Sequence, residues 1–211
     1  MLTPGSIRLR PRPTPLRRVR LPGGERVNMR PIRADDAAAF ACAYTRLSEQ
    51  SRHRRFLSLA TTLQPDDLRY LTAVDHHDHA ALVAIDPETG DIRGSARYLR
   101  LTSRPNEAEL AIEVVDAWQR RGIGRALLQA LSTLALATGV HRFTAIVAAD
   151  NVPVQRALRH AAATVHAAEG ELDYTLDVAR LAQPSRATPP APKRRTRRPL
   201  FPAHDNHVSP V

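Results

Sequence analysis

The fold is decided by residues 117–128, AWQRRGIGRALL, which join an apolar run at 109–115 to a longer amphipathic run at 125–138. The first run has the pattern of a strand and the second has the spacing of a helix. The first turn of a helix carries unpaired N–H groups and partial positive charge, so it attracts anions. A strand, a loop with two glycines and a helix therefore predict a binding site for a pyrophosphate.

The residue types in this loop suit an anion. Glycines at 122 and 124 allow the backbone to approach a phosphate closely, and three arginines add formal positive charge. The predicted pyrophosphate site consists of Gln119, Arg120, Arg121, Gly122, Ile123, Gly124, Arg125 and Ala126.

Length and composition favour one domain of ordinary size. The chain has 211 residues and contains no run of 18 apolar residues, so we expect no transmembrane helix. The basic N-terminus lacks the apolar segment of a secretory signal, and a single cysteine, Cys42, excludes an internal disulfide framework. We therefore expect a cytoplasmic protein.

The net charge of +10 is concentrated at the two ends of the chain. Residues 1–24 hold six arginines and no acid, and residues 181–211 hold six basic residues and one acid. Residues 25–180 hold 19 basic and 20 acidic residues, so no basic binding face is expected there. We predict disordered, proline-rich basic tails at 1–16 and 181–211 around a domain at 17–180. Nucleic-acid binding is not expected except through those tails.

The hydrophobic pattern of the middle of the chain predicts an α/β domain with a mixed, mostly antiparallel sheet flanked by helices. A hairpin with a Gly-Gly turn is expected at 19–32. Asp35 and Asp36 are placed to cap a helix that runs to Leu47. The other expected elements are a helix or turn at 48–58, a helix at 65–72, strands at 80–85, 92–101 and 109–115, a helix at 125–138, a strand at 143–148, a helix at 154–163 and one or two strands within 164–178.

The residues at 119–124, QRRGIG, together with Asn151 after the following strand, resemble two cofactor motifs of the GCN5-related N-acetyltransferase superfamily. Local detail is similar to the acetyltransferase domain of bacterial protein-lysine acetyltransferases, over about residues 17–180. The additional matching residues are Arg30-Pro31-Ile32-Arg33, Arg46-Leu47-Ser48, Ser51-Arg52, Arg55-Phe56, Val83-Ala84 and Asp116-Ala117-Trp118. The resemblance implies acetyl-CoA as co-substrate and an amine as acceptor.

Two glutamates are candidate bases for that chemistry. Side chains alternate along a strand, so Glu109 and Glu113 share one face, at positions where we expect burial. An amine must lose a proton before it attacks a thioester, and a carboxylate or a water that it holds can accept that proton. Glu109 is the first candidate because it matches the glutamate that has this role in the lysine acetyltransferases, and Glu113 is the second.

The resemblance also implies direct attack without an acyl-enzyme. Backbone N–H groups near Val114 and Val115 would stabilise the oxyanion, and the pantetheine arm would pair with this strand like an added strand. Asn151 would contact the cofactor, although its position also suits a helix cap. Leu158 stands where family members often have a tyrosine acid, so the thiolate leaves without an acid or His160 replaces that tyrosine.

The acceptor is expected to be a protein lysine. A small-molecule amine, or acyl-CoA binding without catalysis, are the alternatives. No metal site is expected, because His76, His77, Asp78 and His79 are too close in sequence for good ligand geometry. The oligomeric state is not predicted.

Overall fold

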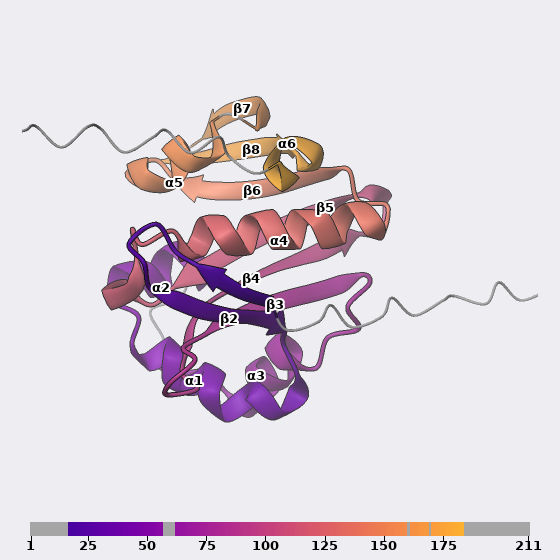
Figure 1. Ribbon diagram of the computed structural model, residues 1–211. Helices are drawn as coiled ribbons and strands as arrows, with labels where there is room; N and C mark the ends of the chain where they lie inside the picture. Colours follow the sequence, from indigo (N-terminus) through magenta and orange to yellow (C-terminus); the bar gives the residue numbers. More distant parts are fainter. Residues whose placement is uncertain (1–16, 57–61, 160, 169, 184–211) are drawn as a thin grey trace, which may run out of the picture.

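One pair of neighbouring strands in the sheet is parallel, and every other pair is antiparallel. The computed structural model describes residues 17–56, 62–159, 161–168 and 170–183. Within them lies an eight-stranded sheet in the order β1-β2-β3-β4-β5-β6-β8-β7 (Figure 1). The strands are β1 (Arg17–Arg20), β2 (Arg26–Pro31), β3 (His79–Ile85), β4 (Ile92–Leu101), β5 (Arg104–Val114), β6 (Arg142–Ala148), β7 (Ala162–Ala168) and β8 (Glu171–Asp177).

Six α-helices accompany this sheet in the described part of the chain. They are α1 (Ala37–Thr45), α2 (Glu49–Phe56), α3 (Pro65–Thr72), α4 (Ile123–Ala137), α5 (Val152–Leu158) and α6 (Val178–Ala182). Short 3₁₀ turns precede α1 at Ala34–Asp36 and α4 at Asp116–Trp118. The predicted α/β class with a mostly antiparallel mixed sheet is confirmed. None of the described helices is long and apolar enough to cross a membrane.

Helix α4 makes the crossover that a parallel pair of strands requires, from the end of β5 to the start of β6 (Figure 1). Its buried side chains recur at helical spacing, at Leu127, Leu131 and Ala135. They belong to one core cluster with Leu110 of β5 and Phe143 of β6. This packing fixes the start of α4 relative to both strands.

The opposite face of β3 to β5 carries a second core cluster under α1 and α3. Phe40 of α1 and Leu71 of α3 pack there with Val83 and with Val115, which follows β5. Each face of this half of the sheet is therefore covered by helices, as in a three-layer arrangement. Figure 1 shows α1 and α3 together at the lower end of the view.

Three local expectations differ from the structure. Asp36 was expected to cap α1, but its carboxylate accepts hydrogen bonds from Arg30 and from the backbone N–H of Arg33, and it makes no cap bond to α1. Helix α5 spans Val152–Leu158, so it is shorter than the helix expected at 154–163.

The third difference concerns the C-terminal boundary. The tail was predicted to begin at residue 181, yet Leu181 lies within α6 and is buried, because it packs with Val178 in the α4 core. The folded part therefore extends past residue 180. The tails predicted at 1–16 and at 184–211 lie outside the described residues.

Candidate active site

The parallel strands β5 and β6 pair over only a short length. Their register joins Glu107 to Arg142, Ala108 to Phe143 and Glu109 to Thr144, and the ladder ends there. Beyond Glu109 the strands separate, although β5 continues to Val114. An edge of β5 thus carries backbone groups without a neighbouring strand. Such an edge can accept an extended ligand as an added strand.

The backbone of Val114 is directed to this open edge, whereas that of Val115 is not. The Val115 N–H donates to the Arg93 carbonyl at 3.0 Å, on the β4 side of the strand. Successive amides point to opposite sides of a strand, so the Val114 N–H points toward β6. The expectation for Val115 is therefore wrong: its N–H is already used. The Val114 N–H remains free for a ligand at the open edge, at the loop end of β5 and about 17 Å along the strand from Glu109.

The loop after β5 has the backbone conformation of an anion-binding turn. Arg120 has φ 58° and Gly122 has φ 97°, both in the left-handed region. A Cβ atom at position 122 would lie 2.9 Å from Cδ of Pro22, so glycine is required there for space as well as for conformation. No side chain caps the start of α4. The first-turn N–H groups, from Ile123 onward, are thereby left for an anion.

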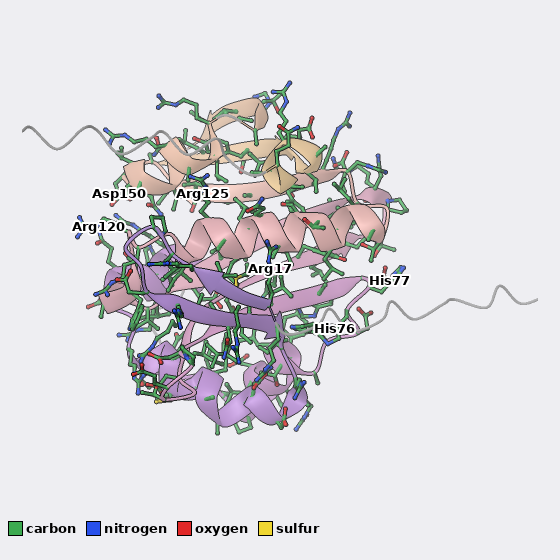
Figure 2. The ribbon with its side chains drawn as sticks, viewed as in Figure 1. Arg17, His76, His77, Arg120, Arg125 and Asp150 are labelled. Atoms are coloured by element: carbon green, nitrogen blue, oxygen red, sulfur yellow. The ribbon has the colours of Figure 1, made fainter. Side chains whose placement is uncertain are left out.

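The three arginines of the loop differ in their surroundings. Arg121 pairs with Glu25 at 3.1 Å, and its guanidinium lies over the Trp118 ring at 4.8 Å from the centroid. Arg120 and Arg125 are exposed and have no ion pair among the described residues. Figure 2 shows both at the N-terminal end of α4. Arg120 and Arg125 are therefore better placed than Arg121 to neutralise phosphates.

Glu109 lies at the last paired position of β5 and β6, which is the vertex of the opening between them. Its side chain is exposed, so the expectation of burial is wrong for this residue. The alternation of the strand predicts which face Glu109 occupies, but it does not predict whether a helix covers that face. At the vertex, the carboxylate is accessible both to solvent and to a reacting group.

Glu113 has a different environment on the same face. It is partly buried, and Oγ of Ser95 donates a hydrogen bond to its Oε1. It borders a cavity of about 10 Å³ together with Tyr44 and Val115. That volume is about the space that one water molecule needs. Glu113 is therefore better suited to hold this part of the sheet than to meet an acceptor.

Asn151 begins α5 at the end of the β6 strand. Its side chain makes no cap hydrogen bond to α5, although its backbone carbonyl accepts from the Gln155 N–H at 3.1 Å. The capping alternative for the side chain is therefore wrong, and the amide remains available to a ligand. His160, the alternative acid, lies outside the described residues.

Helix α2 connects the loops on the two sides of the opening. At its start, Oγ of Ser51 donates to Asp116 at 2.6 Å, and Gln119 donates to the same carboxylate at 2.7 Å. At its other end, Arg54 pairs with Asp150, which follows β6, at 2.6 Å. Sequence reasoning missed this arrangement, because Arg54 and Asp150 are 96 residues apart and no local pattern links them.

The histidine-rich segment forms no metal site with the described residues: no group of three or more His, Cys, Asp or Glu side chains there has the geometry to hold an ion. His79 instead contacts the buried Arg97, with 3.3 Å between Nε2 and Nη1. Burial, reinforced by the nearby charge of Arg97, lowers the pKa of His79 to about 4. Figure 2 shows His76 and His77 on the other side of the molecule from Arg120.

Comparisons with known proteins identify the family of this chain. Residues 43–162 match the model of the Acetyltransferase (GNAT) family, and the chain belongs to that family. It is 33% identical over 133 residues to acetyltransferase Pat of Mycolicibacterium smegmatis, a match that covers 63% of this chain and 40% of that protein. The chain thus spans less than half the length of that relative.

Solved structures show the same architecture. The GNAT domain of S. lividans PAT superposes with a TM-score of 0.71 and 29% identity, covering 77% of this chain and 96% of that one. An acetyltransferase from Salmonella typhimurium, solved with acetyl-CoA, has a TM-score of 0.59 and 21% identity, covering 72% of this chain and 94% of that one. At 21% identity, the similarity to the Salmonella typhimurium protein shows a shared fold and nothing more.

Proposed function

We propose that this chain transfers the acetyl group of acetyl-CoA to the side-chain amine of a protein lysine. The observation that carries the proposal is the opening between β5 and β6, with Glu109 at its vertex and the uncapped start of α4 at its mouth. The relatives named above are acetyltransferases, and two of them are proteins named Pat. Arg30-Pro31-Ile32-Arg33 and Asp116-Ala117-Trp118 resemble the corresponding residues of bacterial protein-lysine acetyltransferases. This resemblance supports a protein acceptor over a small one.

The spacing of the site favours a long, thin donor. The five residues from Leu110 to Val114 separate Glu109 from the loop and span about 17 Å of strand. A donor held by its phosphates at α4 must therefore carry its reactive group at the far end of an extended arm. Coenzyme A has this shape, because its pantetheine arm links the pyrophosphate to the thioester. The arm's amides would pair with the free edge of β5.

In this mechanism Glu109, directly or through a water, accepts a proton from the lysine ammonium. The neutral amine attacks the acetyl carbonyl carbon, and a backbone N–H on the open edge of β5 near Glu109 stabilises the oxyanion that forms. The Val114 N–H, at the loop end of the strand, pairs with the arm closer to its phosphates. The C–S bond then breaks and the thiolate of coenzyme A leaves. Arg120, Arg125 and the first-turn N–H groups of α4 hold the pyrophosphate throughout. Asn151 binds the donor from the β6 side.

The test measures thiol release from acetyl-CoA with a lysine-containing peptide and, in parallel, with a panel of small amines. We expect the peptide to be acetylated. Glu109→Gln should lower kcat by about 10² to 10⁴, the usual contribution of a general base, while the KM for acetyl-CoA stays unchanged. Glu113→Gln is the matched control, with a smaller loss.

Two results would contradict the proposal. Transfer to a small amine without transfer to any peptide would overturn the acceptor. Full activity of Glu109→Gln would overturn the assignment of the base.

A further inference from the structure

The chain contains one lysine among its 31 basic residues, and this lysine is Lys193. The other 30 are arginines, whose guanidinium groups stay protonated near neutral pH and do not act as nucleophiles. Residues 17–183, which include every described residue, contain no lysine at all. The only side-chain amine available for acetylation within these 211 residues is therefore that of Lys193.

The sequence around this lysine is strongly cationic. Residues 193–198 read KRRTRR, and the nine residues between Gln183 and Lys193 contain one further arginine, Arg186, and no acid. A segment of this charge is attracted to surfaces that carry unpaired carboxylates. The segment 193–198 is called the lysine segment below.

The face of the sheet that carries Glu109 offers such a surface. In the strand register, Glu109 of β5 lies beside Thr144 of β6, and Thr144 lies beside Thr175 of β8. Because side chains alternate along a strand, Asp173 and Glu171 of β8 lie on the same face as Thr175. Glu109, Asp173 and Glu171 are exposed or partly exposed and make no ion pair with the described residues.

Two further features of this face favour a docked segment. The nearby cations of the face are already paired, Arg142 with Glu107 at 3.5 Å and Arg54 with Asp150 at 2.6 Å. Ile146 of β6 lies opposite Asp173 in the register and is 56% exposed, which gives an apolar contact for the stem of a lysine or arginine. The face therefore combines unpaired negative charge with exposed apolar surface.

The chain is long enough for the lysine segment to reach Glu109 of the same molecule. The described chain ends on the α4 side of the sheet, where Nε2 of Gln129 donates to the Ala182 carbonyl at 3.3 Å. The path back along α6, around the end of the sheet at Asp177 and diagonally across β8 and β6 to Glu109 is about 31 Å, given the helix rise, the layer spacing, the strand rise and two strand spacings. Ten residues reach about 33–36 Å when extended.

We propose that Lys193 is an acetylation site of this chain's own active site, reached within one molecule by docking of the lysine segment on the face formed by Glu109, Ile146, Glu171 and Asp173. This inference rests on the proposed acetyltransferase function. A tether of this length presents the lysine to its own active site at an effective concentration on the order of millimolar. At lower protein concentrations the reaction within one molecule is therefore faster than the reaction between two molecules.

The chemistry is balanced without any further reactant. Glu109 accepts a proton from the Lys193 ammonium and passes it to solvent. Nζ then forms a bond to the acetyl carbon as the C–S bond of acetyl-CoA breaks. As the C–S bond breaks, the nitrogen loses its second proton and the departing sulfur takes up a proton, so the products are an amide at Lys193, coenzyme A as the thiol and one proton. The modification neutralises one positive charge of the lysine segment and weakens its attraction to the acidic face, so the face is released for other acceptors.

The experiment incubates the full chain with acetyl-CoA and follows the mass of the intact protein and of its peptides. We expect one acetyl group, at Lys193. Because the reaction takes place within one molecule, its rate constant should not change when the protein is diluted about a hundredfold. Glu109→Gln should slow the modification by about 10² to 10⁴. A rate proportional to protein concentration, or an unchanged rate in Glu109→Gln, would overturn the proposal.

A second set of variants tests the docking face. Asp173→Asn should slow the modification about threefold at low salt and less at high salt, because the attraction is screened. Glu88→Gln is the matched control: it removes an exposed carboxylate from the β3–β4 turn, away from this face, and should have no effect. An equal effect of both variants would contradict docking on the face.

Lys193→Arg separates this inference from the proposed function. It should abolish modification of the chain while thiol release with an external lysine peptide continues. If the wild-type protein acetylates the peptide and leaves Lys193 unmodified, the inference fails and the function stands. If neither the peptide nor Lys193 is acetylated, both fail.

Discussion

Arg54 and Asp150 form an ion pair, with 2.6 Å between Nη2 and Oδ2, that joins α2 to the connection after β6. Asp116, after β5, binds Ser51 near the start of the same helix. Helix α2 is thus fixed to both strands that border the donor opening. It holds the mouth of that opening at a set width, although the strands themselves are no longer paired there.

The first prediction concerns this ion pair. A double-mutant cycle of Arg54→Gln and Asp150→Asn, measured by chemical denaturation, should give a coupling energy of about 0.2–1 kcal/mol, because the carboxylate is largely exposed. The control pair is Arg69 and Asp66 on α3, whose side chains are 73% and 87% exposed. Its coupling should be smaller. A larger coupling in the α3 pair would contradict the bridging role of α2.

The second prediction concerns the glycine at the start of α4. Gly122→Ala should destabilise the protein by about 1–3 kcal/mol, because alanine disfavours φ 97° and would crowd Pro22. It should also weaken the binding of coenzyme A. Gly139→Ala is the matched control, with φ 82° and open space around the added Cβ. It should destabilise the protein without changing the affinity for coenzyme A, measured by calorimetry.

The third prediction separates the loop arginines. Arg125→Gln should weaken coenzyme A binding about tenfold at low salt, because an exposed cation at the helix start is lost. Arg121→Gln should have a smaller effect on binding, because Arg121 is already paired with Glu25. Titrations at two salt concentrations measure both. Equal losses in the two variants would show that Arg121 leaves Glu25 to bind the donor.

The fourth prediction concerns pH and His79. Its pKa in the folded protein is about 4, below the usual 6.5. Between these values the unfolded chain binds a proton that the folded chain does not, so the free energy of unfolding should fall as pH falls from 6.5 to 4. His79→Gln should flatten this dependence, as measured by denaturation at several pH values. His77→Gln, which leaves the contact of His79 with Arg97 intact, is the control.

Periodicity predicted most of the elements because their patterns are local. The loop at 119–124 and the helix after it are examples: the glycines, the arginines and the apolar spacing stand in one continuous stretch. The helix at Val178–Ala182 was missed because five residues give too short a pattern. What fixes it is contact with α4, which no local pattern contains.

The candidate site was predictable in kind but not in detail. Strand alternation placed Glu109 and Glu113 on one face, whereas their different exposure depends on which helices cover that face. The hydrogen bond from the Val115 N–H to the Arg93 carbonyl across the sheet decides which backbone N–H is free: that of Val114 is, and that of Val115 is not. The link between Arg54 and Asp150 joins distant segments, so only the folded structure reveals it.

The short ladder between β5 and β6 divides the sheet into two antiparallel halves, β1 to β5 and β6 to β7, that meet in only three register pairs. A donor arm paired with the free edge of β5 would supply backbone partners along this seam. The substrate would then act as a temporary strand of the enzyme, and slower amide exchange at Ile112 and Val114 would report its binding. Each catalytic cycle would then form backbone hydrogen bonds between the donor arm and β5 and break them again when the product leaves.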